Sequence, residues 1–212
     1  MKRKFTYDII FEFIVYLLTA GYMIYGILSG EQNYVINGAM TIGVMILPRV
    51  VMRIFKFKVS PFLNFLVQFF IFISMFLGKV QNYYGKFSWW DLFLHAVSGI
   101  VIFLVAYMLF LLQNNCETSN VKPILIITYA LIFAIAMTAI WEMWEFAGDR
   151  LLGLNSQGGS LMDTMEDIIA GSVGPLFMVP LLASYLNGKK NILFDDLTKF
   201  IKENNKEKTI NK

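Results

Sequence analysis

Six long apolar stretches constrain this chain more than any other feature. Each contains about 20 largely apolar residues, which is the length that an α-helix needs to cross the hydrocarbon of a bilayer. They span approximately 9–29, 34–53, 61–79, 90–112, 123–147 and 162–186. Hydrophobic residues make up 57% of the chain and charged residues 16%, against about 45–50% and about 25% in soluble domains. The sequence therefore predicts an all-α integral membrane protein with six transmembrane helices. It excludes a soluble enzyme and a basic nucleic-acid-binding protein.

The distribution of basic residues predicts the direction of the six helices. With the N-terminus in the cytoplasm, fifteen of the eighteen Lys and Arg residues fall on the cytoplasmic side. Only Lys79, Lys86 and Arg150 fall outside. Because cytoplasmic loops carry an excess of Lys and Arg, we predict a multi-pass plasma-membrane protein with both termini in the cytoplasm. The first apolar run follows Lys2-Arg3-Lys4 and is too long for a signal peptide, so we expect it to be retained.

The chain is predicted to divide at about residue 190. Residues 1–190 form the six-helix transmembrane domain, and residues 191–212 form a charged cytoplasmic tail. Apolar residues recur at helical spacing in this tail: Ile192, Leu193, Leu197, Phe200 and Ile201. This pattern indicates a short amphipathic helix on the inner membrane surface. The single Cys116 excludes an intramolecular disulfide and is expected to be a free thiol in a polar loop.

Ionisable residues gather at one end of three predicted helices. They lie at the start of 90–112, at the end of 123–147 and at the start of 162–186, and they are Asp91, His95, Glu142, Glu145, Asp149, Asp163 and Asp167. Under the predicted orientation, all three groups reach the extracytoplasmic end of the bundle. The spacing within each group is i,i+3, i,i+4 or i,i+7, which places its members on one helix face.

The negative charges of carboxylates in these positions must be neutralised. An ionised carboxylate at the centre of a membrane helix costs about 2.5–3.5 kcal/mol on insertion scales. Several of them on facing helices repel one another unless a cation or shared protons neutralise them. The basic residues nearby are few, namely Arg150 and Lys86. The sequence therefore predicts a divalent cation or shared protons at this end.

The ligand types narrow the choice of cation. Carboxylates with one imidazole suit Mg, Mn or Fe better than Zn. The candidate metal ligands are the seven residues of the cluster: Asp91, His95, Glu142, Glu145, Asp149, Asp163 and Asp167. Glu142, Glu145 and His95 are also the candidate acid–base groups, and Arg150 is the candidate for binding an anionic lipid headgroup.

Simpler roles exist for several of these residues. Ser160 and Asp163 have the spacing of a helix-capping box, and Asp91 favours the start of a helix through the macrodipole. Glu145 or Asp149 could form an ordinary salt bridge with Arg150. The four tryptophans lie where an interfacial aromatic belt is expected, at positions 89, 90, 141 and 144.

The three motifs resemble those of a known family. Trp90-Asp91-x3-His95-x3-Gly99, Trp141-Glu142-x2-Glu145-x3-Asp149 and Asp163-Thr164-x2-Asp167 are similar to motifs of the YjdF-like family of bacterial inner-membrane proteins. The resemblance covers roughly 90–175, and it implies a six-span fold and a shared motif set without supplying a reaction. A looser similarity to VanZ-like membrane proteins rests only on the Asp-x3-His helix start.

Three functions are compatible with this pattern. The first is a divalent-metal-dependent enzyme that acts on a lipid or lipid-linked substrate. The second is a proton- or cation-coupled transporter, because intramembrane acids and histidines also form proton relays. The third is a membrane scaffold with a structural cation. Asp8-x3-Glu12 near the N-terminus echoes Asp91-x3-His95, which suggests either an inverted repeat or simple pairing with Arg49 and Arg53.

Overall fold

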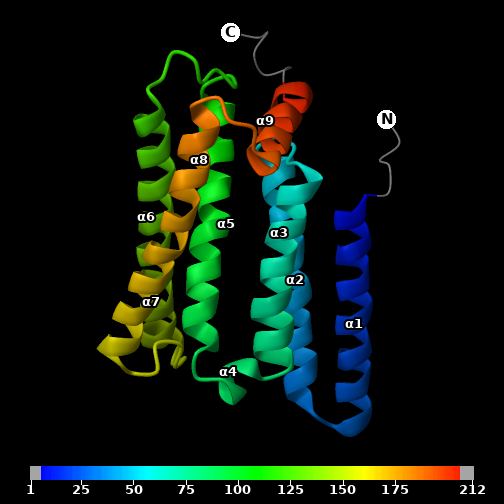
Figure 1. Cartoon of the computed structure of the whole chain (residues 1–212). Coiled ribbons are helices and arrows are strands. Elements are labelled where there is room, and N and C mark those ends of the chain that lie inside the picture. The colour runs from blue at the N-terminus through cyan, green and yellow to red at the C-terminus, as the bar shows by residue number, and fades with distance from the viewer. Residues whose placement is uncertain (1–5, 206–212) are drawn as a thin grey trace. The chain divides into compact units, whose positions relative to one another are not determined.

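The computed structural model describes residues 6–205, and every regular element in that range is helical. Figure 1 shows the helices in chain order. Their bounds are α1 Tyr7–Ser29, α2 Gln32–Ile54, α3 Pro61–Ile71, α4 Tyr83–Lys86, α5 Trp90–Gln113, α6 Pro123–Leu152, α7 Leu161–Val173, α8 Met178–Leu186 and α9 Ile192–Asn204. A π-helical segment, Phe72–Val80, extends α3, and a 3₁₀ turn, Gly174–Phe177, joins α7 to α8. The basic Lys2-Arg3-Lys4 and the last three lysines lie outside the described residues.

Six candidate spans are long and apolar enough to cross a membrane, which confirms the all-α, six-span prediction. Their ends agree with the predicted ranges to within two residues at every boundary but one. The exception is α6, which continues five residues past the predicted end at 147 and stops at Leu152. Asp149 and Arg150 therefore belong to the last turns of this helix.

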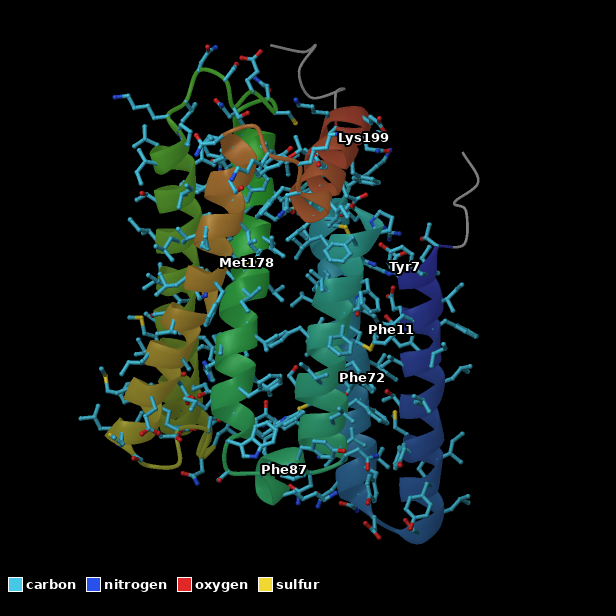
Figure 2. The ribbon with its side chains drawn as sticks, in the orientation of Figure 1. Tyr7, Phe11, Phe72, Phe87, Met178 and Lys199 are labelled. Carbon is cyan, nitrogen blue, oxygen red and sulfur yellow. The ribbon has the colours of Figure 1, made fainter. Side chains whose placement is uncertain are left out.

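The chain divides after Trp90 into two compact units. In the N-terminal unit, α1 packs along α2 and α3, and the core contains Val15, Met45 and Ile71. Figure 2 shows Phe11 and Phe72 in this unit. Their rings meet edge to face with centroids 5.9 Å apart. Aromatic contacts of this kind supply packing where lipid removes the hydrophobic driving force between helices.

The C-terminal unit contains α5 to α9. Within the last span, the α-helix changes to a 3₁₀ turn at Gly174-Pro175. Proline causes this change, since it cannot donate a backbone hydrogen bond inside a helix. The π-helical end of the third span was not predicted. The division of the chain into 1–190 and 191–212 stays a prediction.

The amphipathic helix of the tail is present as α9, and part of its apolar face packs on protein. Phe194 packs edge to face on Tyr107 of α5, with ring centroids 5.3 Å apart, and stacks on Tyr185 of α8. The hydroxyls of Tyr107 and Thr198 lie 3.1 Å apart and share a hydrogen bond. Phe194 is fully buried. Part of this face thus contacts aromatic residues of α5 and α8, whereas Ile192 is 90% exposed. The contact of α9 with the inner membrane surface stays a prediction.

Candidate metal site

One imidazole nitrogen lies at the centre of three carboxylates in the C-terminal unit. His95 Nε2 is 3.7 Å from Asp91 Oδ1, 3.7 Å from Glu142 Oε1 and 3.7 Å from Asp167 Oδ2. His95, Glu142 and Asp167 are buried, whereas Asp91 is half-buried. Ligand atoms of Asp91, His95 and Asp167 all lie within 4.8 Å of one another. The structure thus brings residues of α5, α6 and α7 to one point.

These distances do not correspond to hydrogen bonds, which join nitrogen and oxygen at about 2.7–3.2 Å. Neither carboxylate oxygen of Glu142 has a hydrogen-bond partner within residues 6–205. Buried carboxylates without partners are costly. Ligands in adjacent positions around a metal lie about 3.0–3.5 Å apart when each metal–ligand bond is about 2.1 Å. The ligand atoms of Asp91, His95 and Asp167 form a slightly wider group than this, and Glu142 lies next to that group through its 3.7 Å approach to His95.

Small residues one turn away from His95, Glu142 and Asp167 allow the three helices to approach one another. Gly99 follows His95 by four residues, Gly171 follows Asp167 by four, and Thr138 precedes Glu142 by four. A Cβ added at Gly99 would overlap the carbonyl oxygen of Gly171, and a Cβ at Gly171 would lie 2.6 Å from Thr138 Oγ1. Such close contacts are typical of helix packing in membranes. They explain why the ligand-type residues of three different helices meet.

The helix termini account for part of the local charge. Asp91 and Asp163 lie in the first turns of α5 and α7, where the helix dipole stabilises a carboxylate. Ser160 Oγ accepts a hydrogen bond of 3.4 Å from the backbone N–H of Asp163, which is one half of the predicted capping box, whereas the backbone N–H of Ser160 donates to the carbonyl of Gln157. Glu142 lies in the C-terminal half of α6, where the dipole gives a carboxylate no help. A negative charge on Glu142 therefore needs a positive charge other than a helix dipole to stabilise it.

Asp149 is held elsewhere, by the loop between α6 and α7. Its Oδ1 accepts a hydrogen bond of 2.7 Å from the backbone N–H of Ser156, and its Oδ2 accepts one of 3.0 Å from that of Gln157. The Gln157 side chain in turn donates to Thr164 Oγ1 at 2.9 Å and to the backbone carbonyl of Glu142 at 3.5 Å. Asp149 thus fastens the loop next to the cluster. Gln157 had no sequence signal, because its contacts depend on the loop conformation.

The remaining predicted site residues also have separate partners. Trp141 Nε1 donates a hydrogen bond of 3.1 Å to Glu145 Oε1. The guanidinium of Arg150 lies over the ring of Phe146, with its central carbon 5.4 Å from the ring centroid. The structure therefore gathers four of the seven predicted ligands, and places Glu145, Asp149 and Asp163 in other interactions. The assignment of all seven as metal ligands stays a prediction.

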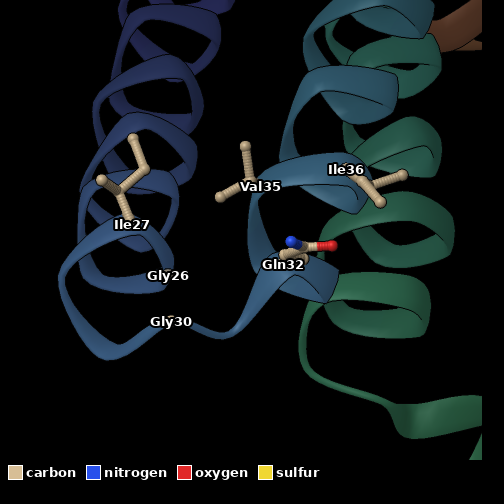
Figure 3. A pocket seen from close by; sticks show the side chains of 6 residues that line it. All are labelled: Gly26, Ile27, Gly30, Gln32, Val35 and Ile36. Atoms are coloured by element: carbon tan, nitrogen blue, oxygen red, sulfur yellow. The ribbon is translucent and has the colours of Figure 1, made fainter.

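A groove of about 750 Å³ opens beside the cluster. Its walls come from α6, α7 and the loop between them, and include Glu142, Arg150 and the apolar side chains of Met143, Leu161 and Ile168. Glu142 belongs both to this groove and to the group around His95. A smaller groove of about 380 Å³ lies at the turn between α1 and α2. Figure 3 shows its lining residues, none of which carries an ionisable side chain.

The fold and the clustered ionisable groups define a multi-span membrane protein with a candidate cation site. The chain matches the family described as predicted membrane protein (DUF2238) over residues 10–188, and it belongs to that family. A protein of Thermotoga maritima described as uncharacterized is 27% identical over 120 residues, which cover 56% of this chain and 60% of the relative. No solved structure matches the chain. The resemblance to the YjdF-like family is compatible with this membership and stays a prediction.

Proposed function

We propose that this protein is a divalent-metal-dependent membrane enzyme that acts on a lipid or lipid-linked substrate. The observation that carries the proposal is the position of His95 Nε2, 3.7 Å from an oxygen of each of three carboxylates. Such a group is expensive to keep within a membrane protein without a compensating cation. Intramembrane ionisable residues are functional candidates for the same reason.

The residues divide into two roles. Asp91, His95 and Asp167 hold the metal, and Glu142 either completes the ligand set or acts as the general base. A bound divalent ion polarises a substrate oxygen and lowers the pKa of bound water. The mixed oxygen and imidazole set favours Mg, Mn or Fe over Zn.

The groove beside Glu142 suits an amphipathic substrate. Arg150 provides a positive charge for a phosphate or carboxylate in the headgroup. Met143, Leu161 and Ile168 supply apolar walls for the hydrocarbon part. Because Glu142 lines the groove and also contacts His95, a headgroup bound to Arg150 lies in the same groove as a side chain of the metal cluster.

Metal analysis of protein purified in detergent tests this function. We expect about one equivalent of divalent metal in wild type, and affinity lowered by about 100-fold or more in His95→Gln, because loss of even a supporting residue costs about 10–100-fold. Glu166→Gln is the matched control, since Glu166 is an exposed acid on the same helix as Asp167. Metal-dependent turnover of anionic lipids, with KM raised in Arg150→Gln, supports the enzyme.

Two outcomes contradict this proposal. Equal metal content in wild type and His95→Gln would show that the cluster is not the binding site. Metal binding that supports thermal stability without turnover of any phospholipid or lipid-linked phosphate would identify a structural cation and leave a scaffold as the function.

We further propose that both termini face the cytoplasm of a bacterial plasma membrane, and Cys116 tests this orientation. It is the single cysteine of the chain and lies after the end of α5. We expect a membrane-impermeant maleimide to label Cys116 only after the cells are permeabilised. Burial raises the pKa of the Cys116 thiol, so the labelling is run at about pH 8.5, where more thiolate is present.

The control carries its cysteine in the loop between α6 and α7. Asn155 is exposed in this loop, so Asn155→Cys in a Cys116→Ser background is expected to react in intact cells. Labelling of Cys116 in intact cells, with Asn155→Cys protected, would reverse the orientation and place the candidate metal site on the cytoplasmic side.

A further inference from the structure

The C-terminal end of α2 carries basic residues that the proposed enzyme does not use. Arg49 and Arg53 lie one turn apart, and Lys56 follows in the turn that ends the helix. Lys58 lies two residues further on and already takes part in another interaction. Residues 32–90 contain no acidic side chain. The excess of basic residues in cytoplasmic loops accounts for the sign of these charges, but not for their placement on the helix.

The two arginines differ in their surroundings. Arg49 forms an ion pair with the buried Glu12 of α1, which also accepts a hydrogen bond of 3.1 Å from the hydroxyl of Tyr16. This confirms the pairing of Glu12 with Arg49 that the sequence suggested as one alternative. The ion pair holds Arg49 at the edge of the helix packing, with its side chain 35% exposed. Arg53 is exposed and has no ion-pair partner among residues 6–205.

Lys56 occupies a backbone position that favours glycine. It follows the C-cap of α2 with a φ of +52°, and the backbone N–H of Phe57 donates to the carbonyl oxygen of Met52 at 3.1 Å. Left-handed residues that end helices in this way are usually glycine, because a Cβ is unfavourable there. Lysine at this position therefore costs stability and adds an exposed positive charge at the negative end of the helix dipole. Within the part of the chain that the structure describes, Lys56 has no ion-pair partner either.

Exposed apolar side chains continue the arginine face toward the middle of α2. Ile46, Arg49, Val50 and Arg53 follow one another at i, i+3, i+4 and i+7. Residues at this spacing form one stripe along a helix. Ile46 and Val50 are 44% and 42% exposed. The stripe thus presents hydrocarbon along the helix and two guanidinium groups at its end.

We propose that this stripe binds an anionic phospholipid, with the phosphate between the two arginines and an acyl chain along the apolar residues. Guanidinium groups bind phosphate through paired, charge-assisted hydrogen bonds, and basic residues at the end of a transmembrane helix attract anionic headgroups. A phospholipid combines the phosphate and the hydrocarbon that the two parts of the stripe require. The charges of Arg53 and Lys56 favour a headgroup of net negative charge over a zwitterionic one. The site lies within the N-terminal unit and is independent of the proposed metal centre.

Native mass spectrometry of the purified protein in detergent tests the proposal. The probes are phosphatidylglycerol and phosphatidylcholine with identical acyl chains, and we expect wild type to bind phosphatidylglycerol about 10-fold more tightly or more. Arg53→Gln is expected to lower this affinity about 5-fold, because each basic residue near an anionic headgroup contributes about that factor. Lys79→Gln is the matched control, since Lys79 is an exposed lysine of the same unit and its carbonyl oxygen contacts Asn37, near the other end of α2.

Lys56→Gly separates lipid binding from stability. Glycine relieves the left-handed backbone, so the variant is expected to unfold at a temperature at least as high as wild type. Its affinity for phosphatidylglycerol should nevertheless fall about 5-fold. The unfolding midpoint and the lipid affinity are measured on the same preparations. A lower midpoint with unchanged lipid affinity would contradict the proposal, because the lysine would then serve only the turn.

Further outcomes would overturn the lipid site. Equal affinity of wild type for the two lipids would show that the charge of the headgroup is not recognised. Equal losses of affinity in Arg53→Gln and Lys79→Gln would indicate general electrostatic attraction instead of a site. Displacement of the lipid by inorganic phosphate at the concentration of the lipid would identify a site for a soluble anion. The preference for phosphatidylglycerol is expected to persist in Asp167→Asn, and its loss there would place the lipid at the metal centre instead.

Discussion

In EDTA, Asp167→Asn is expected to unfold at a higher temperature than wild type, and in excess divalent metal at a lower one. Without metal and at about pH 9, where the carboxylates are ionised, Asp167 and Glu142 repel each other, and the substitution removes one of the two charges. With metal at about 100 times its dissociation constant, wild type gains about 2.7 kcal/mol. That corresponds to about 5–10 °C for a chain of this size. The variant loses most of this gain, because it lacks one anionic ligand.

The difference in unfolding temperature between Asp167→Asn and wild type thus changes sign between EDTA and excess metal. This change of sign distinguishes a metal site from a structural charge cluster. Glu166→Gln removes a charge from the same helix at an exposed position, so it should follow wild type in both conditions. A variant that is less stable than wild type in EDTA as well would mean that Asp167 contributes through protein contacts alone. Differential scanning of the purified protein in detergent, with and without Mn²⁺, provides the measurement.

Gly171→Leu is expected to destabilise the protein by about 3 kcal/mol or more and to abolish metal binding, although Gly171 is not a ligand. A Cβ at Gly171 would lie 2.5 Å from Thr138 Cγ2 and 2.6 Å from Thr138 Oγ1. Overpacking of this kind costs about 1–3 kcal/mol and sometimes more. Because Thr138 precedes Glu142 by one turn and Gly171 follows Asp167 by one turn, separating α6 from α7 also separates two of the four clustered side chains.

The control for this substitution is Gly43→Leu. Gly43 lies within α2, another transmembrane helix, and a Cβ there would meet nothing within 4 Å. Both variants replace glycine by leucine inside a helix, so the difference between them reports the steric contact. Unfolding midpoint and metal content are measured on the same preparations. Normal metal content in Gly171→Leu would show that the close approach of the helices does not determine the site.

The positions of the spans were accessible from the sequence because they depend on a local property. About 20 consecutive apolar residues satisfy the backbone internally as a helix and match the thickness of the hydrocarbon. The π-helical end of the third span could not be predicted, because a run of apolar residues looks the same whether its backbone is α-helical or π-helical. The docking of α9 was missed for a related reason. An amphipathic pattern identifies an apolar face but not the surface that covers it.

The candidate site was likewise predictable only in part from the sequence. Helical spacing was sufficient to bring Asp91 and His95 onto one face of α5. It could not distinguish Glu142, which contacts His95, from Glu145, which contacts Trp141. That distinction depends on how α6 is rotated about its axis relative to α5 and α7. Contacts at Gly99, Gly171 and Thr138 set this rotation.

The sequence by itself determined the class of the protein, its six spans and the unequal distribution of ionisable groups, since these follow from the energetics of placing apolar and charged residues in a bilayer. Only the tertiary structure decided which ionisable groups meet. It assigned Asp149 to a loop, paired Glu12 with Arg49 and paired Asn64 with Asp8. Close helix packing depends on contacts between residues far apart in the chain, and those contacts determine where each buried charge finds its partner.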